Sequence, residues 1–314
     1  MDDATKRCAV VAVIGAPNAG KSSLVNRLVG AKVSIVTHKV QTTRTRVCGV
    51  AAVGPTQLVF IDTPGIFAPR RRLDRAMVRA AWDALDGADQ VLLVVDAPSL
   101  LSDRDGAGDA AARRAAEDTE AILSALKERR FACDLAVNKI DKTSKLKLLP
   151  LVEDLNRTFA FGDTWFVSAR DGDGIEQLKD ALATRAPEGP WVYPEDQLSD
   201  ISERLMAAEV TREKLYLRLH EELPYQAAVE TTKWERTKKR ELRLEQTIYV
   251  SRESHRPIVL GKDGQTLKSI GTAARAELGE LLGEPVHLFL NVTVKENWAD
   301  DPARYRAIGL DFVE

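Results

Sequence analysis

The sequence predicts an α/β domain, with a mostly parallel sheet and helices on both faces, followed by a smaller α+β domain. Three observations lead to this prediction. Five short apolar runs alternate with helical patterns over roughly the first 185 residues, as in parallel sheets that helices cover on both faces. A stretch with three prolines, residues 186–200, then interrupts the pattern. After it the order changes to one helix, two strands, two helices and a strand, which is typical of a compact α+β module.

The first domain is predicted at residues 1–186, with a linker at 187–200. Its strands are expected at the apolar runs CAVVAVIG, QLVFID, QVLLVVD, CDLAVNK and TWFVS. Each run ends at a polar or glycine-rich turn. Parallel sheets bind their ligands at the carboxyl ends of the strands. The residues that follow these runs are therefore the candidates for chemistry.

The second domain is predicted at residues 201–297, with a C-terminal tail at 298–314. Its first helix and its three strands are expected at Ile201–Glu221, Gln226–Glu235, Leu242–Ser251 and PVHLFLNVTV. Ahead of the last strand, the stretch GKDGQTLKSIG places a pair of glycines before a helical pattern. A glycine pair in this position allows another chain to come close to the backbone.

The composition is that of a soluble globular protein. The 314 residues are enough for two domains with separate cores, and 44% are apolar and 29% charged. No apolar run reaches the roughly 18 residues that span a bilayer, and the start MDDATKRCAV lacks the apolar core of a secretion signal. Cys8, Cys48 and Cys133 have no metal-ligand spacing, which indicates free thiols in a reducing cytosol. We therefore expect a cytoplasmic protein.

A phosphate-binding loop follows the first strand. The stretch GAPNAGKS has the pattern Gly15-x-x-x-x-Gly20-Lys21-Ser22 between a strand and a helix. In this pattern the backbone amides wrap the phosphates, the lysine reaches the β and γ phosphates, and the hydroxyl holds Mg²⁺. The residues predicted to contact the nucleotide here are Gly15, Ala16, Pro17, Asn18, Ala19, Gly20, Lys21, Ser22 and Ser23.

The base that the site selects is predicted from NKID, which follows a strand on the ligand side of the sheet. The Asp141 carboxylate can accept hydrogen bonds from N1 and N2 of guanine, whereas adenine would leave it unpaired. The SAR motif after the next strand can offer a backbone N–H to the guanine O6. These two motifs add Asn138, Lys139, Ile140, Asp141, Ser168 and Ala169 to the predicted nucleotide contacts.

Two further stretches are predicted to sense the γ-phosphate and the metal. In DTPG, Asp62 suits a water-bridged Mg²⁺ contact and the Gly65 amide can bond the γ-phosphate. The stretch HKVQTTRTR lies where a mobile switch belongs, and we favour Thr43 over Thr42 as a metal ligand because Thr43 directly precedes the arginine. The predicted metal ligands are Ser22, Thr43 and Asp62. The predicted catalytic residues are Lys21, Thr43, Gly65 and Asn18, and Asp62, Thr63, Pro64, Gly65 and Ile66 complete the nucleotide contacts.

The first domain resembles the translation-factor-related class of small GTPases, with GAPNAGKS, QTTR, DTPG, NKID and SAR in order. The resemblance implies GTP and GDP as ligands with Mg²⁺. Ile66 stands where Ras-like proteins carry a catalytic glutamine, which implies slow intrinsic hydrolysis. Asn18 lies where potassium-activated members of the class hold K⁺.

The second domain resembles a type II KH domain, whose Gly-x-x-Gly loop clamps the backbone of RNA. The predicted RNA contacts are Gly261, Lys262, Asp263, Gly264 and Lys268. Asp263 weakens the argument from charge alone. The helix N-terminus and Lys262 supply positive potential.

The two domains in this order resemble the Era family, bacterial GTPases of ribosome assembly. EELPYQAAVE, GKDGQTLKSIG and LLGEPVHLFLNVTVKENW look like signatures of the family's second domain. The resemblance implies a monomer that binds 16S rRNA near its 3′ end and acts in assembly of the small ribosomal subunit and in rRNA maturation. It also implies peripheral association with the inner membrane, for which KWERTKKRELR, with six basic and two acidic residues, is a weak hint.

Three other functions fit parts of the pattern. A metabolic kinase or ATPase would use the phosphate loop, but NKID argues against adenine. A tRNA-modifying GTPase would share the first domain but carry other flanking domains. A signalling GTPase at the membrane would use the basic segment to bind lipid.

Overall fold

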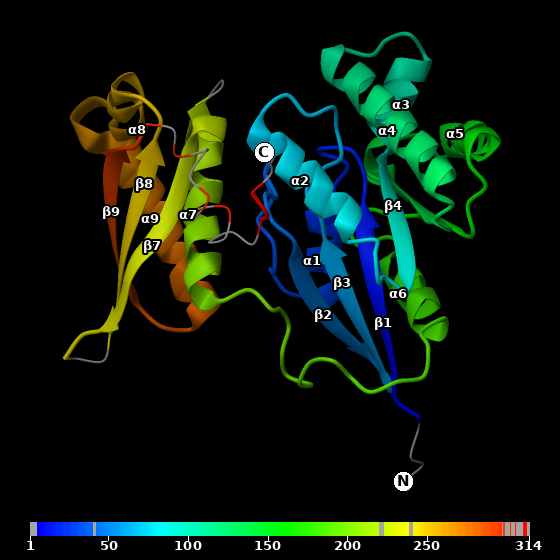
Figure 1. Ribbon diagram of the computed structural model, residues 1–314, viewed down its shortest axis with the longest axis horizontal. Helices are drawn as coiled ribbons and strands as arrows, with labels where there is room; N and C mark the ends of the chain where they lie inside the picture. The colour runs from blue at the N-terminus through cyan, green and yellow to red at the C-terminus, as the bar shows by residue number, and fades with distance from the viewer. Residues whose placement is uncertain are drawn as a thin grey trace. The chain divides into compact units, whose positions relative to one another are not determined.

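The computed structural model describes residues 5–39, 42–219, 223–238, 241–296, 298, 302, 305 and 310–312, and Figure 1 shows its helices and strands. These residues form two compact units. The first contains the chain up to Ser34 together with Thr43–Asp200, and the second contains Ile35–Thr42 together with Ile201–Phe312.

The first unit is built on a six-stranded sheet in the order β2-β3-β1-β4-β5-β6. Its strands are β1 (Arg7–Ile14), β2 (Val47–Val53), β3 (Thr56–Asp62), β4 (Gln90–Asp96), β5 (Asp134–Asn138) and β6 (Thr164–Phe166). All neighbours pair in parallel except β2 and β3, which are antiparallel. The prediction of a mostly parallel sheet is confirmed. Strand β2 was not predicted, because the run VCGVAAV contains small residues that give a weak strand signal.

Helices cover both faces of this sheet, as predicted. They are α1 (Lys21–Val29), α2 (Arg72–Asp83), α3 (Ala97–Arg104), α4 (Ala110–Arg129), α5 (Lys145–Thr158) and α6 (Ile175–Thr184). Successive residues of β1 point to opposite faces. Val11 and Val13 pack with α1 and α6, whereas Ala12 and Ile14 share a core with α2, α3, α4 and α5.

Residues 187–200, predicted as a linker, are bonded along the first unit. The amide of Val50 donates to the carbonyl of Leu198 over 2.8 Å, and the amide of Cys48 donates to the Asp200 carboxylate over 3.0 Å. Gly49 and Ser199 form an antiparallel bridge. These contacts satisfy backbone groups on the outer side of β2, which an edge strand otherwise leaves open. In the structure the first unit therefore extends to Asp200 and not only to residue 186.

The second unit has the predicted order of elements. Its sheet has the order β7-β8-β9, in which β7 and β8 are antiparallel and β8 and β9 are parallel. The elements are α7 (Glu203–Arg218), β7 (Ala227–Arg236), β8 (Leu242–Val250), α8 (Arg256–Leu260), α9 (Gln265–Leu282) and β9 (Val286–Val294). Every second side chain of β8 is buried, because one face of the sheet packs on the core that α7 and α9 cover.

The predicted tail at residues 298–314 is described only at Trp298, Pro302, Tyr305 and residues 310–312. Trp298, Tyr305 and Leu310 are buried, and the Trp298 indole donates to the carbonyl of Gln226 over 3.0 Å. Trp298 is therefore attached to the start of β7, and these tail residues belong to the second unit. Within the described parts of the chain, the longest apolar stretches of helix fall short of what a membrane crossing requires.

Candidate nucleotide and RNA sites

The phosphate loop lies between β1 and α1, as the motif predicts. Gly20 has φ +98°, and a Cβ at this position would lie 2.2 Å from Nδ2 of Asn138. A residue with a side chain would therefore both strain the backbone and displace Asn138. Asn138 donates to the carbonyl of Ala19 over 2.9 Å and accepts from the amide of Ala169 over 3.1 Å. One buried side chain thus joins the three loops of the predicted nucleotide site.

The side chain of Lys21 is hydrogen-bonded to the backbone of the phosphate loop. Its ammonium donates to the carbonyls of Gly15 and Ala16 over 3.1 and 3.0 Å, and its side chain is buried. Burial lowers the pKa of Lys21 to about 8, although the nearby Asp62 charge opposes this shift. A phosphate in the loop would add a second negative charge and favour the charged form of Lys21.

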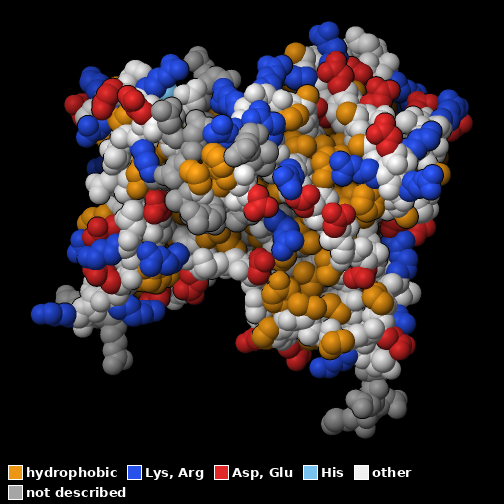
Figure 2. Space-filling view, viewed as in Figure 1, with side chains coloured by type: hydrophobic (Ala, Val, Ile, Leu, Met, Phe, Trp, Pro, Cys, Tyr) orange, Lys and Arg blue, Asp and Glu red, His pale blue; other side chains and the backbone are white. Residues whose placement is uncertain are grey.

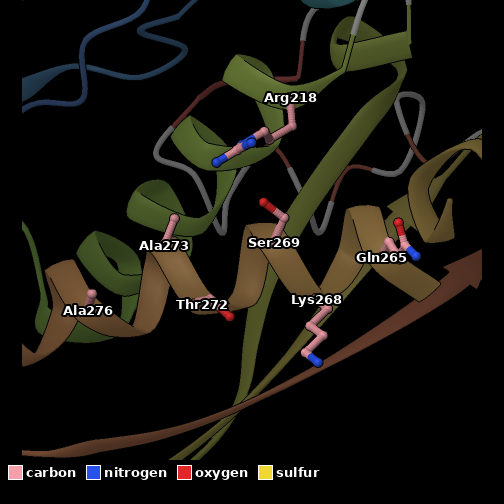
Figure 3. Close-up of a pocket in the computed structure, with 7 residues that line it drawn as sticks. All are labelled: Arg218, Gln265, Lys268, Ser269, Thr272, Ala273 and Ala276. Atoms are coloured by element: carbon pink, nitrogen blue, oxygen red, sulfur yellow. The ribbon is translucent and has the colours of Figure 1, made fainter. Parts of the chain in front are cut away.

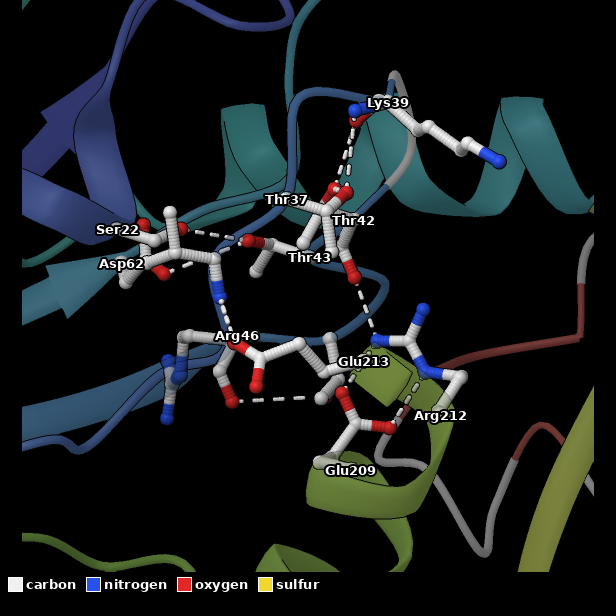
Figure 4. Close-up of polar contacts among 12 residues, drawn as sticks. Ser22, Thr37, Lys39, Thr42, Thr43, Arg46, Asp62, Glu209, Arg212 and Glu213 are labelled. Atoms are coloured by element: carbon white, nitrogen blue, oxygen red, sulfur yellow. Dashed lines mark hydrogen bonds and ion pairs between the residues drawn. The ribbon is translucent and has the colours of Figure 1, made fainter. Parts of the chain in front are cut away.

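The three predicted metal ligands meet at the edge of the sheet. Oγ of Ser22 and Oγ1 of Thr43 lie 2.8 Å apart, and Thr43 Oγ1 lies 3.5 Å from Oδ2 of Asp62. Figure 4 shows the three side chains directed toward one another. Neighbouring ligands of an octahedral Mg²⁺ lie about 3.0 Å apart, given Mg–O distances of about 2.1 Å. The separation of the two hydroxyls therefore suits adjacent positions on one Mg²⁺.

Asp62 contributes to this cluster a carboxylate that can bind a cation. Its side chain is fully buried and, among the described residues, its Oδ1 has no hydrogen-bond partner. Burial raises the pKa of the Asp62 carboxyl, and contacts from Ser22 and Lys21 oppose this shift. Oxygen donors of this kind are what Mg²⁺ prefers, so these residues fit the metal. Thr42, the alternative, instead donates its hydroxyl to the carbonyl of Lys39 over 2.7 Å.

The other part of the predicted switch is described incompletely. Val40 and Gln41, within HKVQTTRTR, lie outside the described residues.

After DTPG, Ile66 is buried and its amide donates to the carbonyl of Gly15 over 3.1 Å. The Thr63 hydroxyl donates to the carbonyl of Val13 over 2.8 Å, which fixes the start of this stretch against β1. An apolar side chain at Ile66 offers no group that could orient water.

The predicted base site is formed at the ends of β5 and β6. Ser168 Oγ donates to Oδ1 of Asp141 over 2.8 Å, and Arg170 lies 3.1 Å from the other oxygen, Oδ2. The Asp141 side chain is only 5% exposed, whereas that of Arg170 is 64% exposed. The SAR motif is predicted to offer a backbone N–H to guanine O6, and one of its amides, that of Ala169, donates to Asn138 here. The contact with O6 therefore stays a prediction.

Two residues that sequence reasoning missed also belong to this site. Asp96, at the end of β4, lies 2.5 Å from Lys139 Nζ, and Lys139 also donates to the carbonyl of Asn18 over 2.7 Å. This chain of contacts ties NKID to the phosphate loop. Asp96 could have been found because it ends the run QVLLVVD at the ligand edge of the sheet. Arg170 carried no comparable signal.

The Gly-x-x-Gly loop lies between α8 and α9. At Gly261, φ is +73°, and a Cβ would lie 2.1 Å from the Thr266 hydroxyl oxygen, so that only glycine fits. Lys262 and Asp263 are exposed. The backbone N–H groups at the start of α9, an 18-residue helix, follow directly and favour an anion nearby.

A hollow of about 460 Å³ lies beside this loop, on the exposed side of α9. Its lining consists of Arg218, Gln265, Lys268, Ser269, Thr272, Ala273 and Ala276. Figure 3 shows Arg218, from α7, opposite Ser269 of α9. Lys268, a predicted RNA contact, is therefore part of a concave surface with a second cation. On the face visible in Figure 2, acidic and basic side chains are interspersed.

Within the described part of the basic segment KWERTKKRELR, Lys233, Arg236 and Arg243 pair with glutamates. Arg236 pairs with Glu284 over 2.6 Å, and Arg243 pairs with Glu245 over 2.9 Å. Lys239 and Arg240 lie outside the described residues. Ion pairs of this kind reduce the positive potential of the segment and so weaken its attraction to an anionic membrane. Association with the inner membrane therefore stays a prediction that the local charges do not strengthen.

The phosphate loop of the first unit and the Gly-x-x-Gly loop of the second define a class of protein. It is a GTPase followed by a domain of an RNA-binding type. A family model described as "50S ribosome-binding GTPase" matches residues 10–148, and one described as "KH domain" matches residues 222–299. The chain is 55% identical to "GTPase Era" of Rhizobium meliloti over 306 residues, which is 98% of this chain and 93% of that protein. It is 54% identical to "GTPase Era" of Caulobacter vibrioides over 99% of each chain.

Two solved structures are similar over nearly the full length. One is a crystal structure of Era in complex with MgGDPNP and nucleotides 1506–1542 of 16S ribosomal RNA, with a TM-score of 0.87, 35% identity, and coverage of 97% of this chain and 99% of that one. The other is a single-substitution variant of Era from Aquifex aeolicus bound to GDP·AlF4−, with a TM-score of 0.87, 35% identity, and coverage of 96% and 99%. The chain belongs to the Era family of GTPases, and its second unit is a KH domain.

Proposed function

We propose that this GTPase uses Mg²⁺ and binds 16S rRNA near its 3′ end through the KH domain, acting in small-subunit assembly and rRNA maturation. The observation that carries the nucleotide half is the meeting of Ser22, Thr43 and Asp62 beside the phosphate loop. The RNA half is supported by the glycine loop at the start of α9 and by the similar structure, whose Era binds nucleotides 1506–1542 of 16S rRNA.

Each part of the site has a role in the proposed reaction, in which water attacks the γ-phosphorus and GDP leaves. Lys21 binds the β and γ phosphates, and the Gly65 amide orients the γ-phosphate. Ser22 and Thr43 would hold Mg²⁺ directly, and Asp62 would hold it through water. The bound metal supplies positive charge that stabilises the transferring phosphoryl group. Ile66 has no group that could orient water, so basal hydrolysis is expected to be slow.

The nucleotide state is expected to change RNA affinity. The γ-phosphate is present only in the GTP form, where it favours binding of Thr43 to the metal. The loop before Thr43 is therefore expected to be ordered differently in the GTP and GDP forms. We expect a difference of about 5- to 150-fold in RNA affinity, which is the usual range of coupling between two sites. Binding of a labelled RNA of nucleotides 1506–1542, measured with GDP and with a non-hydrolysable GTP analogue, checks this. Equal affinities would show that the nucleotide does not regulate RNA capture.

Hydrolysis is expected to be faster in K⁺ than in Na⁺. Asn18 is exposed with φ +63°, and its carbonyl accepts from Lys139. Within the described residues no hydrogen bond uses its side chain, which leaves the amide oxygen able to ligand K⁺ beside the phosphates. The ion would offset charge that develops between the β and γ phosphates. Single-turnover rates in matched KCl and NaCl, for wild type and Asn18→Ala, test this. A wild-type rate that does not depend on the cation would disprove it.

We place this activity in the cytoplasm, where ribosomal subunits assemble. A monomeric state and peripheral association with the inner membrane remain predictions. The membrane alternative is tested by sedimentation with anionic vesicles at two salt concentrations, because an electrostatic contact weakens as salt increases.

A further inference from the structure

The described residues just before the predicted metal ligand Thr43, Ile35–Lys39 and Thr42, belong to the same compact unit as the KH domain. The surface they meet is a turn of α7 that carries buried polar residues. Thr211, Arg212 and Glu213 are 0%, 2% and 4% exposed. Charged side chains are rarely buried to this degree unless specific partners satisfy them. The partners of this turn therefore indicate what it is built to hold.

Arg212 holds the main chain of this loop. Its guanidinium donates to the carbonyl of Thr42 over 2.5 Å and is paired with both carboxylate oxygens of Glu209. The same guanidinium lies 5.1 Å from the centre of the Tyr216 ring. Figure 4 shows Arg212 between Glu209 and Thr42. The pair with Glu209 fixes the orientation of the planar fork, which a more flexible lysine could not reproduce.

Two further contacts attach the same loop to α7. The amide of Val36 donates to the Glu213 carboxylate over 2.9 Å, and Lys39 Nζ donates to the carbonyl of Leu219, just after the helix. Lys214 pairs with Glu213 over 2.8 Å and also with Glu277 of α9. The loop is thus connected, through charged contacts, to the helix that begins at the Gly-x-x-Gly loop.

The loop is also braced internally. The hydroxyls of Thr37 and Thr42 lie 2.6 Å apart, and the Lys39 amide donates to the Thr37 hydroxyl over 3.1 Å. One residue further on, the Thr43 hydroxyl lies beside Ser22. The carbonyl that Arg212 holds belongs to the same peptide group as the Thr43 nitrogen. A change in the position of Thr43 therefore moves the group that Arg212 binds.

We propose that Arg212 is a positioning residue that links the nucleotide site to the KH domain by holding the Thr42 carbonyl, one residue before Thr43, on α7. The inference rests on the proposed function, because it names how the nucleotide state reaches the RNA site. Ligation of Thr43 favours the arrangement in which Arg212 binds the Thr42 carbonyl, and loss of the γ-phosphate weakens it. Because coupling is reciprocal, RNA that stabilises this arrangement also strengthens binding of the GTP form.

The test compares Arg212→Lys with Arg204→Lys in the full chain. Arg204 is on the same helix and also donates to a carbonyl, that of Thr231 at 3.1 Å, which lies within the KH domain. Arg212→Lys keeps the charge but loses the fork that spans Glu209 and Thr42. The measured quantity is the ratio of affinities for RNA of nucleotides 1506–1542 with a GTP analogue and with GDP. Circular dichroism and thermal melting confirm that each variant is folded.

We expect the ratio to fall below about 2-fold in Arg212→Lys, from the 5- to 150-fold expected of wild type, and to stay unchanged in Arg204→Lys. Lys39→Ala, in a half-buried side chain, is expected to lower the ratio partly and serves if Arg212→Lys does not fold. A wild-type ratio of one would refute the proposed regulation itself. A wild-type ratio that Arg212→Lys and Lys39→Ala both retain would refute the role of this contact alone.

Discussion

Asp141→Asn is expected to lower GTP affinity by about 10²- to 10⁴-fold, because two hydrogen bonds to a charged acceptor contribute roughly 1.5–3 kcal/mol each. Asparagine presents an N–H₂ donor where guanine also presents donors. Xanthine has a carbonyl at its 2-position, so the variant is expected to gain affinity for XTP. The base site of the variant should keep its structure, because the Ser168 hydroxyl, which donates to Asp141 Oδ1, can donate equally to an amide oxygen.

The measurement is equilibrium binding of GTP, XTP and ATP to wild type and variant. Arg170→Ala is the matched control, because the 64%-exposed guanidinium lies 3.1 Å from the same carboxylate without a predicted contact to the base. We expect this control to keep GTP affinity within a few-fold, as exposed ion pairs contribute about 0–1 kcal/mol. A variant Asp141→Asn that binds GTP tightly and ignores XTP would mean that the base is read elsewhere.

Gly264→Asp is expected to reduce RNA affinity by roughly 30-fold or more, because a like charge placed against a phosphate costs several kcal/mol. Gly264 has φ +74°, and no atom lies within 4 Å of where its Cβ would be. Space for a side chain is therefore present in the free protein. The neighbouring Asp263 already adopts φ 52°, and Asp is one of the residues that tolerate this region.

Gly264→Asn is the matched control, since it adds almost the same bulk without charge and also tolerates positive φ. If charge dominates, RNA binding by Gly264→Asn should be intermediate between wild type and Gly264→Asp. Basal GTP hydrolysis should be near wild type in both variants, because the predicted nucleotide contacts lie in the other unit. Simultaneous loss of hydrolysis and RNA binding in folded protein would contradict this separation of the two sites.

Much of the fold was predictable because the signals are local. Runs such as QLVFID are apolar on both faces, and their turns carry Asp62, Asn138 and Ser168 at the edge where parallel strands end. The α-β-β-α-α-β order was equally visible, because β8 and β9 alternate with a period of two residues. The start of α4 is also local, because the Asp109 carboxylate accepts from the amides of Ala111 and Ala112.

The sequence by itself determined the motifs, their order and the kind of ligand each could hold, because those depend on residue type and short spacing. Only the tertiary structure decided that Leu198 and Asp200 bond to β2, that Asp96 holds Lys139, and that Arg212 of α7 binds the Thr42 carbonyl. Each of these contacts joins residues far apart in the chain. From the sequence alone, Arg212 would be assigned as an exposed helical arginine. Folding brings Thr42, some 170 residues earlier in the chain, into contact with it.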